Sequence, residues 1–525
     1  MEPEKPEVAD GDEAESIFDA PKHGLQGRFA GGVIFNLSSQ VIKLSVQLIS
    51  LAAMSRLLTP ASFGVVAMAT PILLFGNLLQ DLGLTQASVQ QHRLSQRQAS
   101  NMFWVSAGVG TIVTLLLAVT APLLGAFYKD PRVSQILLAS APLALVTSLG
   151  LQHRALLMRR MQFNKLVMRD IAGVVVGMIV AISCAASWHS YWALYASNAA
   201  TVFVTTGGAM IATRWIPSLP ARDPEFKKMI HFGAGLSGYT LTNFLSRNLD
   251  SVLIGRYCGG AALGLYNRGY RILLFPLQQI SWPIVQVMIP TLSKLVGEPD
   301  RYREAYMKVV RVILLITLPG ILILAVDADW LVPLVLGSKW LGVIPIFRNL
   351  AIAGAVQPFN GPMNSLFITQ GRTGQFARWG AFSAVLGAIS FVIGLPGGPT
   401  GVALAYGLTE VFIRSPLYWW YATRQGPVRL IDLGRLGGPF ALATAGVGVL
   451  AFGARMVWSP SSILGLAIYI PVTYGLFWGA IGLFPSGRKT FGAAWRLVQG
   501  YRQKLLGGWS PRATPASVGV KGGEG

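Results

Sequence analysis

Long apolar stretches recur along the whole sequence and constrain its fold more than any other feature. Each approaches or exceeds the ~20 residues that a helix needs to cross the ~30 Å hydrocarbon core of a membrane. Hydrophobic residues make up 52% of the 525 residues and charged residues only 12%, which predicts an all-α polytopic membrane protein rather than a soluble enzyme. We expect about fourteen transmembrane helices, near residues 30–55, 60–84, 101–124, 133–152, 170–188, 191–212, 230–255, 262–290, 309–326, 343–369, 377–396, 400–421, 437–457 and 462–484.

The basic residues indicate how these helices are oriented. The formal net charge is +21, which in a soluble protein would suggest a nucleic-acid partner. If the N-terminus is cytoplasmic, 31 of the 43 Lys and Arg residues fall in cytoplasmic loops and tails, six fall on the opposite side and six lie within the spans. This asymmetry is typical of the positive-inside rule and explains the charge by topology and lipid contact, without nucleic acid. We therefore expect both termini to be cytoplasmic.

The chain also contains an internal repeat. An offset of 200 residues places Arg56 on Arg256, Gly64 on Gly264, and the tetrapeptide 72–75 on 272–275 without a gap. Because six spans separate the copies, the repeats are predicted to be parallel, which gives two six-helix lobes and two further C-terminal helices. The predicted division is an acidic disordered tail (1–27), an N-lobe (28–215), a C-lobe (216–425), two helices (426–485) and a basic tail (486–525).

The run from Met229 to Leu295 holds two spans that contain charged residues. Charges at membrane depth are costly and usually face a bundle interior or a wet cavity. Arg247 and Asp250 are three residues apart, so they share a helix face and can neutralise each other. Pro276, Pro283 and Pro290 follow at intervals of seven residues, and each removes a helical hydrogen bond, which predicts a helix able to bend.

Other charged residues in the spans divide into paired and unpaired groups. Glu410 and Arg414 are four residues apart and form a second predicted ion pair, with helix registry and gating as open roles. Four cations have no acidic neighbour at helical spacing, and these are Lys43, Arg268, Arg271 and Arg348. Snorkelling to an interface remains open for Arg268 and Arg348. For Lys43 and Arg271 we favour a cationic cavity, which suggests an anionic substrate such as a phosphate.

The sequence offers little support for catalysis, metals or cofactors. The five His residues are scattered, and no catalytic triad or poised carboxylate pair is recognisable. Cys184 and Cys258 match no metal-ligand spacing. The segment 233–238 fits G-x-G-x-x-G, but it lies in an apolar span without a βαβ unit, so it predicts close helix packing rather than a dinucleotide site. We expect no enzyme activity, no cofactor and no metal site.

Several segments resemble polysaccharide exporters of the multidrug/oligosaccharidyl-lipid/polysaccharide (MOP) superfamily, of the Wzx type. The first is 243–250, and the others are 254–256, 262–267, Pro276 and 289–293, with 55–64 as the matching element of the first lobe. The resemblance covers most of residues 28–425 and implies a MOP/MATE-like fold. It further implies a bacterial inner-membrane flippase that moves an undecaprenyl-diphosphate-linked oligosaccharide by alternating access, with no information on the sugars.

The resemblance, combined with the unpaired cations, suggests a role for each candidate residue. The predicted diphosphate contacts are Lys43, Arg247, Arg271 and Arg268, and the predicted sugar contacts are Asn36, Gln40, Gln47 and Asn243. Asp250 and Glu410, with Arg414, are candidates for ion coupling or gating, and Pro276 and Pro283 for the hinge. The implied partners are the lipid-linked oligosaccharide, membrane lipids, and the polymerase and chain-length proteins of polysaccharide assembly.

Two other classes of function stay open at this point. One is a MOP exporter of drugs or of the lipid-linked peptidoglycan precursor, and the other is a non-transporting scaffold of a polysaccharide assembly complex. A drug exporter predicts a requirement for unpaired carboxylates, and a peptidoglycan-precursor exporter predicts that deletion is lethal. A scaffold predicts that neutralising the cavity cations changes nothing.

Overall fold

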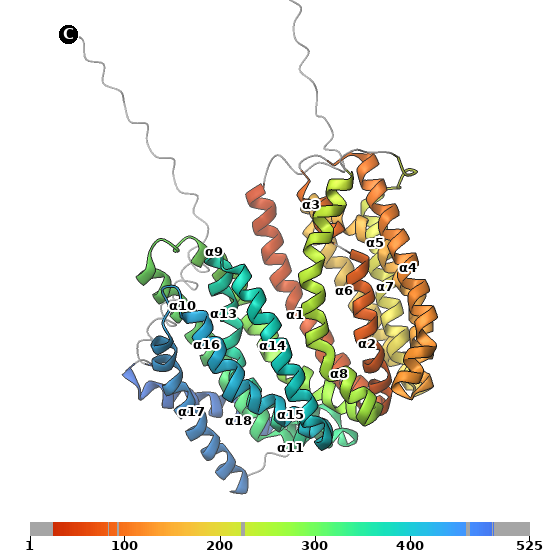
Figure 1. The fold of residues 1–525 in the computed structure, drawn as a ribbon. Helices are drawn as coiled ribbons and strands as arrows, with labels where there is room; N and C mark the ends of the chain where they lie inside the picture. Colours follow the sequence, from red (N-terminus) through yellow and green to blue (C-terminus); the bar gives the residue numbers. More distant parts are fainter. Residues whose placement is uncertain are drawn as a thin grey trace, which may run out of the picture.

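The computed structural model describes residues 25–81, 83–91, 94–221, 226–457, 463–485 and 487. The described secondary structure is helical throughout (Figure 1). The first half contains α1 (Leu25–Leu57), α2 (Pro60–Asp81), α3 (Leu84–Gln90), α4 (Gln96–Tyr128), α5 (Pro131–Arg159), α6 (Phe163–Trp188) and α7 (Trp192–Thr213). The second half contains α8 (Phe226–Pro276), α9 (Trp282–Ser293), α10 (Pro299–Val326), α11 (Ala328–Leu336), α12 (Val343–Gly354), α13 (Gln357–Thr369), α14 (Thr373–Gly394), α15 (Gly398–Thr409), α16 (Ser415–Thr423), α17 (Leu430–Val457) and α18 (Ile463–Gly482).

Four short segments interrupt the α-helices of the second half. Two are π-helices, η1 (Leu277–Ser281) and η4 (Glu410–Arg414), and two are 3₁₀ turns, η2 (Ser338–Trp340) and η3 (Leu395–Gly397). The helix labelled α8 also contains a break at Gly259, where φ is 85° and ψ is 175°. Only glycine adopts this conformation readily, and the break lies between the expected spans 230–255 and 262–290.

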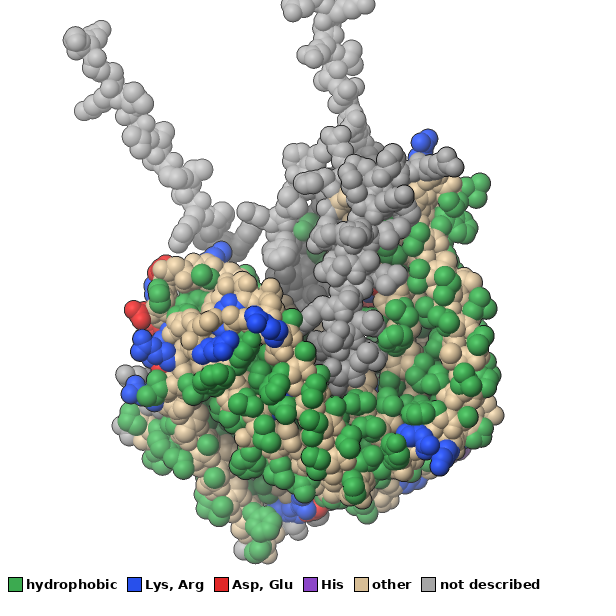
Figure 2. Space-filling view, viewed as in Figure 1, with side chains coloured by type: hydrophobic (Ala, Val, Ile, Leu, Met, Phe, Trp, Pro, Cys, Tyr) green, Lys and Arg blue, Asp and Glu red, His purple; other side chains and the backbone are tan. Residues whose placement is uncertain are grey.

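The length and composition of the helices confirm a polytopic membrane protein. Eight segments among the described residues are long and apolar enough to cross a membrane. Two of these segments are interrupted: Asn248–Ser293 contains Gly259 and η1, and Thr373–Thr423 contains η3 and η4. Hydrophobic side chains cover the flanks in Figure 2, while Lys and Arg gather toward the ends of the visible surface. The count of fourteen crossings and the predicted domain boundaries stay predictions.

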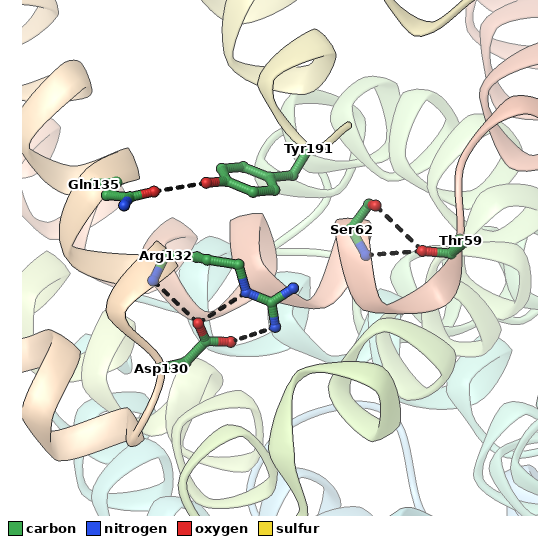
Figure 3. A network of polar contacts seen from close by, with 6 residues as sticks. All are labelled: Thr59, Ser62, Asp130, Arg132, Gln135 and Tyr191. Carbon is green, nitrogen blue, oxygen red and sulfur yellow. Dashed lines mark hydrogen bonds and ion pairs between the residues drawn. The ribbon is translucent and has the colours of Figure 1, made fainter. Parts of the chain in front are cut away.

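Helix ends are fixed by local capping. Ser95 and Gln98 form a capping box at the start of α4, and Asp130 caps α5 by accepting a hydrogen bond from the Arg132 amide at 3.0 Å. The Arg132 guanidinium also pairs with the Asp130 carboxylate at 2.7 Å, and this bond lowers the pKa of Asp130 (Figure 3). In the same network Tyr191 donates to Gln135, which ties α5 to the segment before α7.

The helices assemble into two bundles. In the first, α4 packs along α5, α6 along α7, and α1 along α6. In the second, α12 and α14 pack on α15, and α10 supports α17, which pairs with α18. One large cluster of buried apolar side chains lies within the second bundle, and another joins α2, α4 and α5 to α8, α11, α12 and α15 where the bundles meet. The ribbons of the two bundles diverge toward the end that carries α3 and α9 (Figure 1).

The repeat predicted from sequence lies where the bundles meet. A Cβ atom on Gly64 would lie 1.7 Å from the Gly260 carbonyl oxygen, and one on Gly264 would lie 3.1 Å from the Gly64 amide nitrogen. The repeat-related glycines therefore face each other where α2 crosses α8, and only glycine permits this approach. Arg56 and Arg256, also repeat-related, each reach the opposite bundle, Arg56 at the Leu334 carbonyl and Arg256 over the Phe127 ring.

Candidate functional site

A cavity of about 870 Å³ lies between the two bundles. Helices α1, α2, α6 and α7 contribute to its wall from one side, and α8, η1, α10, α11, α12 and α18 from the other. The wall is mostly apolar. Among the described residues that line the cavity, Arg268 and Arg271 are the charged ones, and none is Asp or Glu. The cavity therefore has a positive potential and suits an anion with an attached apolar group.

Arg268 lines this cavity and lies between two aromatic rings. Its Cζ atom lies 4.0 Å from the centroid of Phe63 and 5.3 Å from that of Trp340, within the range of cation–π attraction. The residue is only 7% exposed, and its Nε and Nη2 atoms have no hydrogen-bond partner among the described residues. A buried guanidinium with unused donors is costly unless an anion accepts from it, which makes Arg268 a strong candidate ligand contact.

Arg271 lies one turn further along α8 and is exposed in the cavity. It has no ion pair within the part of the chain that the structure describes. Lys43 differs from Arg271, because its Nζ lies 3.5 Å from the Asp170 carboxylate of α6, which Arg169 also contacts at 3.2 Å. Lys43 therefore forms an ion pair with a carboxylate from another helix. Arg348 is likewise paired, at 2.6 Å, with Asp329.

Two amide side chains of α1 lie in or beside the cavity, and their predicted role as sugar contacts stays a prediction. Gln47 lines it, and Gln40 donates a hydrogen bond of 3.0 Å to Gln279 in η1. This bond joins the first bundle to the second. The side chains of Asn36, Asn243 and Arg247 lie outside the described residues, so their predicted roles and the predicted Arg247–Asp250 pair stay predictions.

The two candidate coupling carboxylates lie outside the cavity lining. Asp250 is buried and accepts hydrogen bonds from the Ser251 amide at 2.6 Å and the Tyr266 hydroxyl at 3.1 Å. Both oxygens of Asp250 are thus occupied by neutral donors. The coupling role suggested for Asp250 from the sequence stays a prediction.

Glu410 forms the ion pair with Arg414 expected from their spacing, at 3.0 Å. The pair lies in the π-helix η4, where the helix is widened by one residue. Glu410 also accepts from Asn360 at 2.8 Å, and Asn360 accepts in turn from the Trp419 indole at 2.8 Å. This network ties α13 to α16, which favours a structural contribution, while a gating role stays a proposal.

The predicted hinge coincides with a change of helix type. Helix α8 ends at Pro276, the π-helix η1 follows, and α9 begins with Pro283 in its first turn. Proline removes a hydrogen-bond donor on each side of η1, which explains why regular α-helix is interrupted there. The π-helix presents Gln278 and Gln279 to the cavity. Sequence reasoning missed both glutamines because a π-helix has no recognisable sequence signature.

Contacts between the bundles close the end of the cavity near Arg268. The Trp340 indole donates a hydrogen bond to the Ser55 carbonyl at 2.7 Å. Arg56 donates to the Leu334 carbonyl at 2.7 Å, and Lys339 donates to the Arg56 carbonyl at 3.3 Å. Trp340 is fully buried and packs edge-on against Phe63 at 5.3 Å. The rings that hold Arg268 thus come from different bundles and are part of this closure.

Comparison with known proteins places the chain in a family. Residues 53–345, more than half of the sequence, match the family described as "Polysaccharide biosynthesis protein". The chain belongs to this family. Its relatives include the lipopolysaccharide biosynthesis protein WzxC of Escherichia coli (strain K12), 24% identical over 74% of this chain and 79% of WzxC. The teichuronic acid biosynthesis protein TuaB of Bacillus subtilis (strain 168) is 26% identical over 78% of this chain and 86% of TuaB.

Solved structures confirm the MOP-type fold of the chain. The lipid II flippase MurJ in an inward closed conformation superposes with a TM-score of 0.68 at 12% identity, covering 85% of this chain and 98% of MurJ. An inward-facing multidrug resistance MATE family transporter of the MOP superfamily gives a TM-score of 0.57 at 14% identity, covering 75% and 99%. At such low identity these similarities concern the fold.

Proposed function

We propose that this chain is a flippase that moves an undecaprenyl-diphosphate-linked oligosaccharide repeat unit across a bacterial inner membrane. The observation that carries the proposal is the cavity between the bundles, whose described lining has two arginines and no acid. Guanidinium groups bind phosphate oxygens with paired hydrogen bonds, so Arg268 and Arg271 would hold the diphosphate. The apolar walls of α10, α11 and α18 would contact the polyprenyl chain.

The proposed orientation follows from the charge distribution. With both termini in the cytoplasm, the closed end formed by Arg56, Trp340 and the crossing glycines faces the periplasm. The cavity would then load from the cytoplasmic leaflet and release after these contacts separate. Family relatives with names from polysaccharide assembly support a transport role in this process, including the succinoglycan biosynthesis transport protein ExoT of Rhizobium meliloti (strain 1021). Polymerase and chain-length proteins are the proposed partners that receive the repeat unit.

The drug-exporter alternative fits the cavity less well. A site for organic cations requires an unpaired carboxylate, whereas Asp250 and Glu410 lie outside the lining and have donors on their oxygens. We propose that these two carboxylates instead link an ion gradient to the movement of the second bundle. Lys43 would add to the attraction of an anion only when Asp170 is drawn away from it.

Complementation of a deletion strain tests the proposed function. Wild type restores surface polysaccharide, whereas Arg268→Ala and Arg271→Ala at matched membrane abundance do not, and lipid-linked repeat units accumulate. Arg301→Ala serves as the control because Arg301 is an exposed arginine paired with Glu298 outside the cavity. Normal polysaccharide in the deletion strain would contradict the proposal, and full activity of both cavity variants would favour the scaffold alternative.

A further inference from the structure

We propose that Gln278 and Gln279, together with Gln47 and Gln40, form a subsite that recognises the sugar part of the transported lipid. These four residues are called the glutamine wall. The inference rests on the proposed function and deepens it, because it assigns the discrimination between glycosylated and bare polyprenyl diphosphate to a place in the cavity. The π-helix η1 is the element that creates this place.

The position of the wall follows from the helix that carries the arginines. Arg271, Leu274, Phe275 and Gln278 follow one another on the cavity face of α8 and η1, at the spacing of adjacent helical turns. In η1 the wider turn lets Gln279 line the cavity beside Gln278. At 1.5 Å per residue the glutamines lie about 10 Å along the helix from Arg271. A ligand with its diphosphate on the arginines would bring its headgroup to the wall.

The opposite side of the wall comes from α1. Gln40 and Gln47 are two turns apart, so both face the same direction. Gln47 is exposed in the cavity, and Gln40 donates a hydrogen bond of 3.0 Å to Gln279, which also lines it. Gln278 is exposed and has no hydrogen-bond partner within the described part of the chain. The wall thus offers unused amide groups from both bundles.

The chemistry of the wall fits hydroxyl groups. Each amide provides two N–H donors and a carbonyl acceptor without a charge, which matches the donor and acceptor character of a sugar hydroxyl. Ser197 and Thr201 of α7 add hydroxyls to the same cavity. Because no described lining residue is acidic, the wall is suited to neutral or acidic sugars rather than to sugars with a free amine.

A purely structural role for the wall makes a different prediction. The Gln40–Gln279 bond could simply hold α1 against η1, as a contact between the bundles. Its loss would then affect every ligand of the cavity equally. A sugar subsite affects only the ligand that carries sugar.

Binding to the purified full chain in lipid nanodiscs separates these roles. The two probes are undecaprenyl diphosphate and the glycosylated lipid that accumulates in the deletion strain. We expect wild type to bind the glycosylated lipid more tightly, and Gln278→Leu/Gln279→Leu to weaken its binding by about tenfold, as expected for two neutral hydrogen bonds. Binding of the bare lipid stays within about twofold of wild type.

Three further variants complete the experiment. Arg271→Ala weakens binding of both lipids, and Gln135→Leu, which removes an exposed amide paired with Tyr191 outside the cavity, changes neither. Gln40→Leu breaks the bridge and leaves Gln279 in place, so the subsite predicts a selective loss for the glycosylated lipid. Equal weakening of both lipids by the Gln278/Gln279 variant, or no change, would overturn the subsite. Failure of wild type to bind either lipid would overturn the proposed function itself.

Discussion

At the scale of single residues, the environment of each buried cation decides its role. The sequence identified Lys43, Arg268, Arg271 and Arg348 as cations without an acidic neighbour at helical spacing. It could not reveal that Asp170 and Asp329, which lie on other helices, pair with Lys43 and Arg348. Such pairs depend on how helices pack, whereas i,i+4 pairs such as Glu410–Arg414 depend on local geometry alone and could be predicted.

Arg268→Lys tests whether a positive charge at this position is enough for the proposed binding of the diphosphate. Lysine keeps the charge but lacks the planar fork that stacks on Phe63 and binds an anion with two hydrogen bonds. We expect lipid-linked repeat units to accumulate almost as strongly as in Arg268→Ala, with membrane abundance near that of wild type. Quantification of the lipid-linked pool by mass spectrometry checks this, and transport at the wild-type rate would contradict it.

Asp130→Asn tests the capping pair at the start of α5. Because Arg132 lowers the pKa of Asp130 below its ordinary value of 3.8, the pair stabilises the fold above that value and is lost as pH falls through the folded-state pKa. Asparagine keeps the cap but not the charge. At pH 7 the loss stays under about 1 kcal/mol, since Arg132 is 45% exposed. Thermal melting at pH 7 and pH 3 should show a smaller difference at pH 3.

At the scale of helices, the crossing of α2 and α8 follows from the repeat. The gap-free match at an offset of 200 predicted related positions for Gly64 and Gly264, and the structure places them against each other. The breaks in the long spans were harder to predict. Gly259 lies in a recognisable Gly-rich turn, but the π-helices η1 and η4 leave no signature in composition or periodicity.

Gly64→Ala tests whether this crossing closes one end of the cavity. A Cβ atom there would lie 1.7 Å from the Gly260 carbonyl oxygen, so α2 and α8 must separate. We expect loss of polysaccharide and increased labelling of a cysteine introduced at Ser55 by a thiol reagent added from the periplasm. Gly108→Ala is the matched control, because nothing lies within 4 Å of its Cβ position. Unchanged transport and labelling in Gly64→Ala would show that the crossing is not a closure.

At the scale of the whole molecule, two bundles that meet at one end and enclose a cavity suggest transport by rocking. The fold class and the family could be predicted from the sequence, since span length, charge asymmetry and repeat are properties of the chain itself. From the sequence, the cavity could be inferred only from arginines in the spans that have no acidic neighbour at helical spacing. The glutamine wall depends on the register of η1 against α1, which is set by how the helices pack and cannot be read from the sequence.

A cross-link across the closed end tests this motion. Cysteines replacing Arg56 and Lys339, in a chain without Cys184 and Cys258, can be joined by a short cleavable reagent because the two native residues are in contact. We expect the cross-linked protein to lose transport and to regain it after cleavage. Each single-cysteine variant treated with the same reagent should remain active, and transport by fully cross-linked protein would exclude separation of this end.

The proposed flippase activity is tested most directly by measuring transbilayer movement of the lipid in reconstituted vesicles. Purified protein is placed in vesicles with the glycosylated polyprenyl diphosphate, and the headgroup is measured by its cleavage with an added glycosidase that cannot cross the membrane. We expect wild type to bring the lipid of the inner leaflet to the enzyme, whereas Arg271→Ala leaves this lipid protected. Movement in wild-type vesicles no faster than in protein-free vesicles would exclude flippase activity.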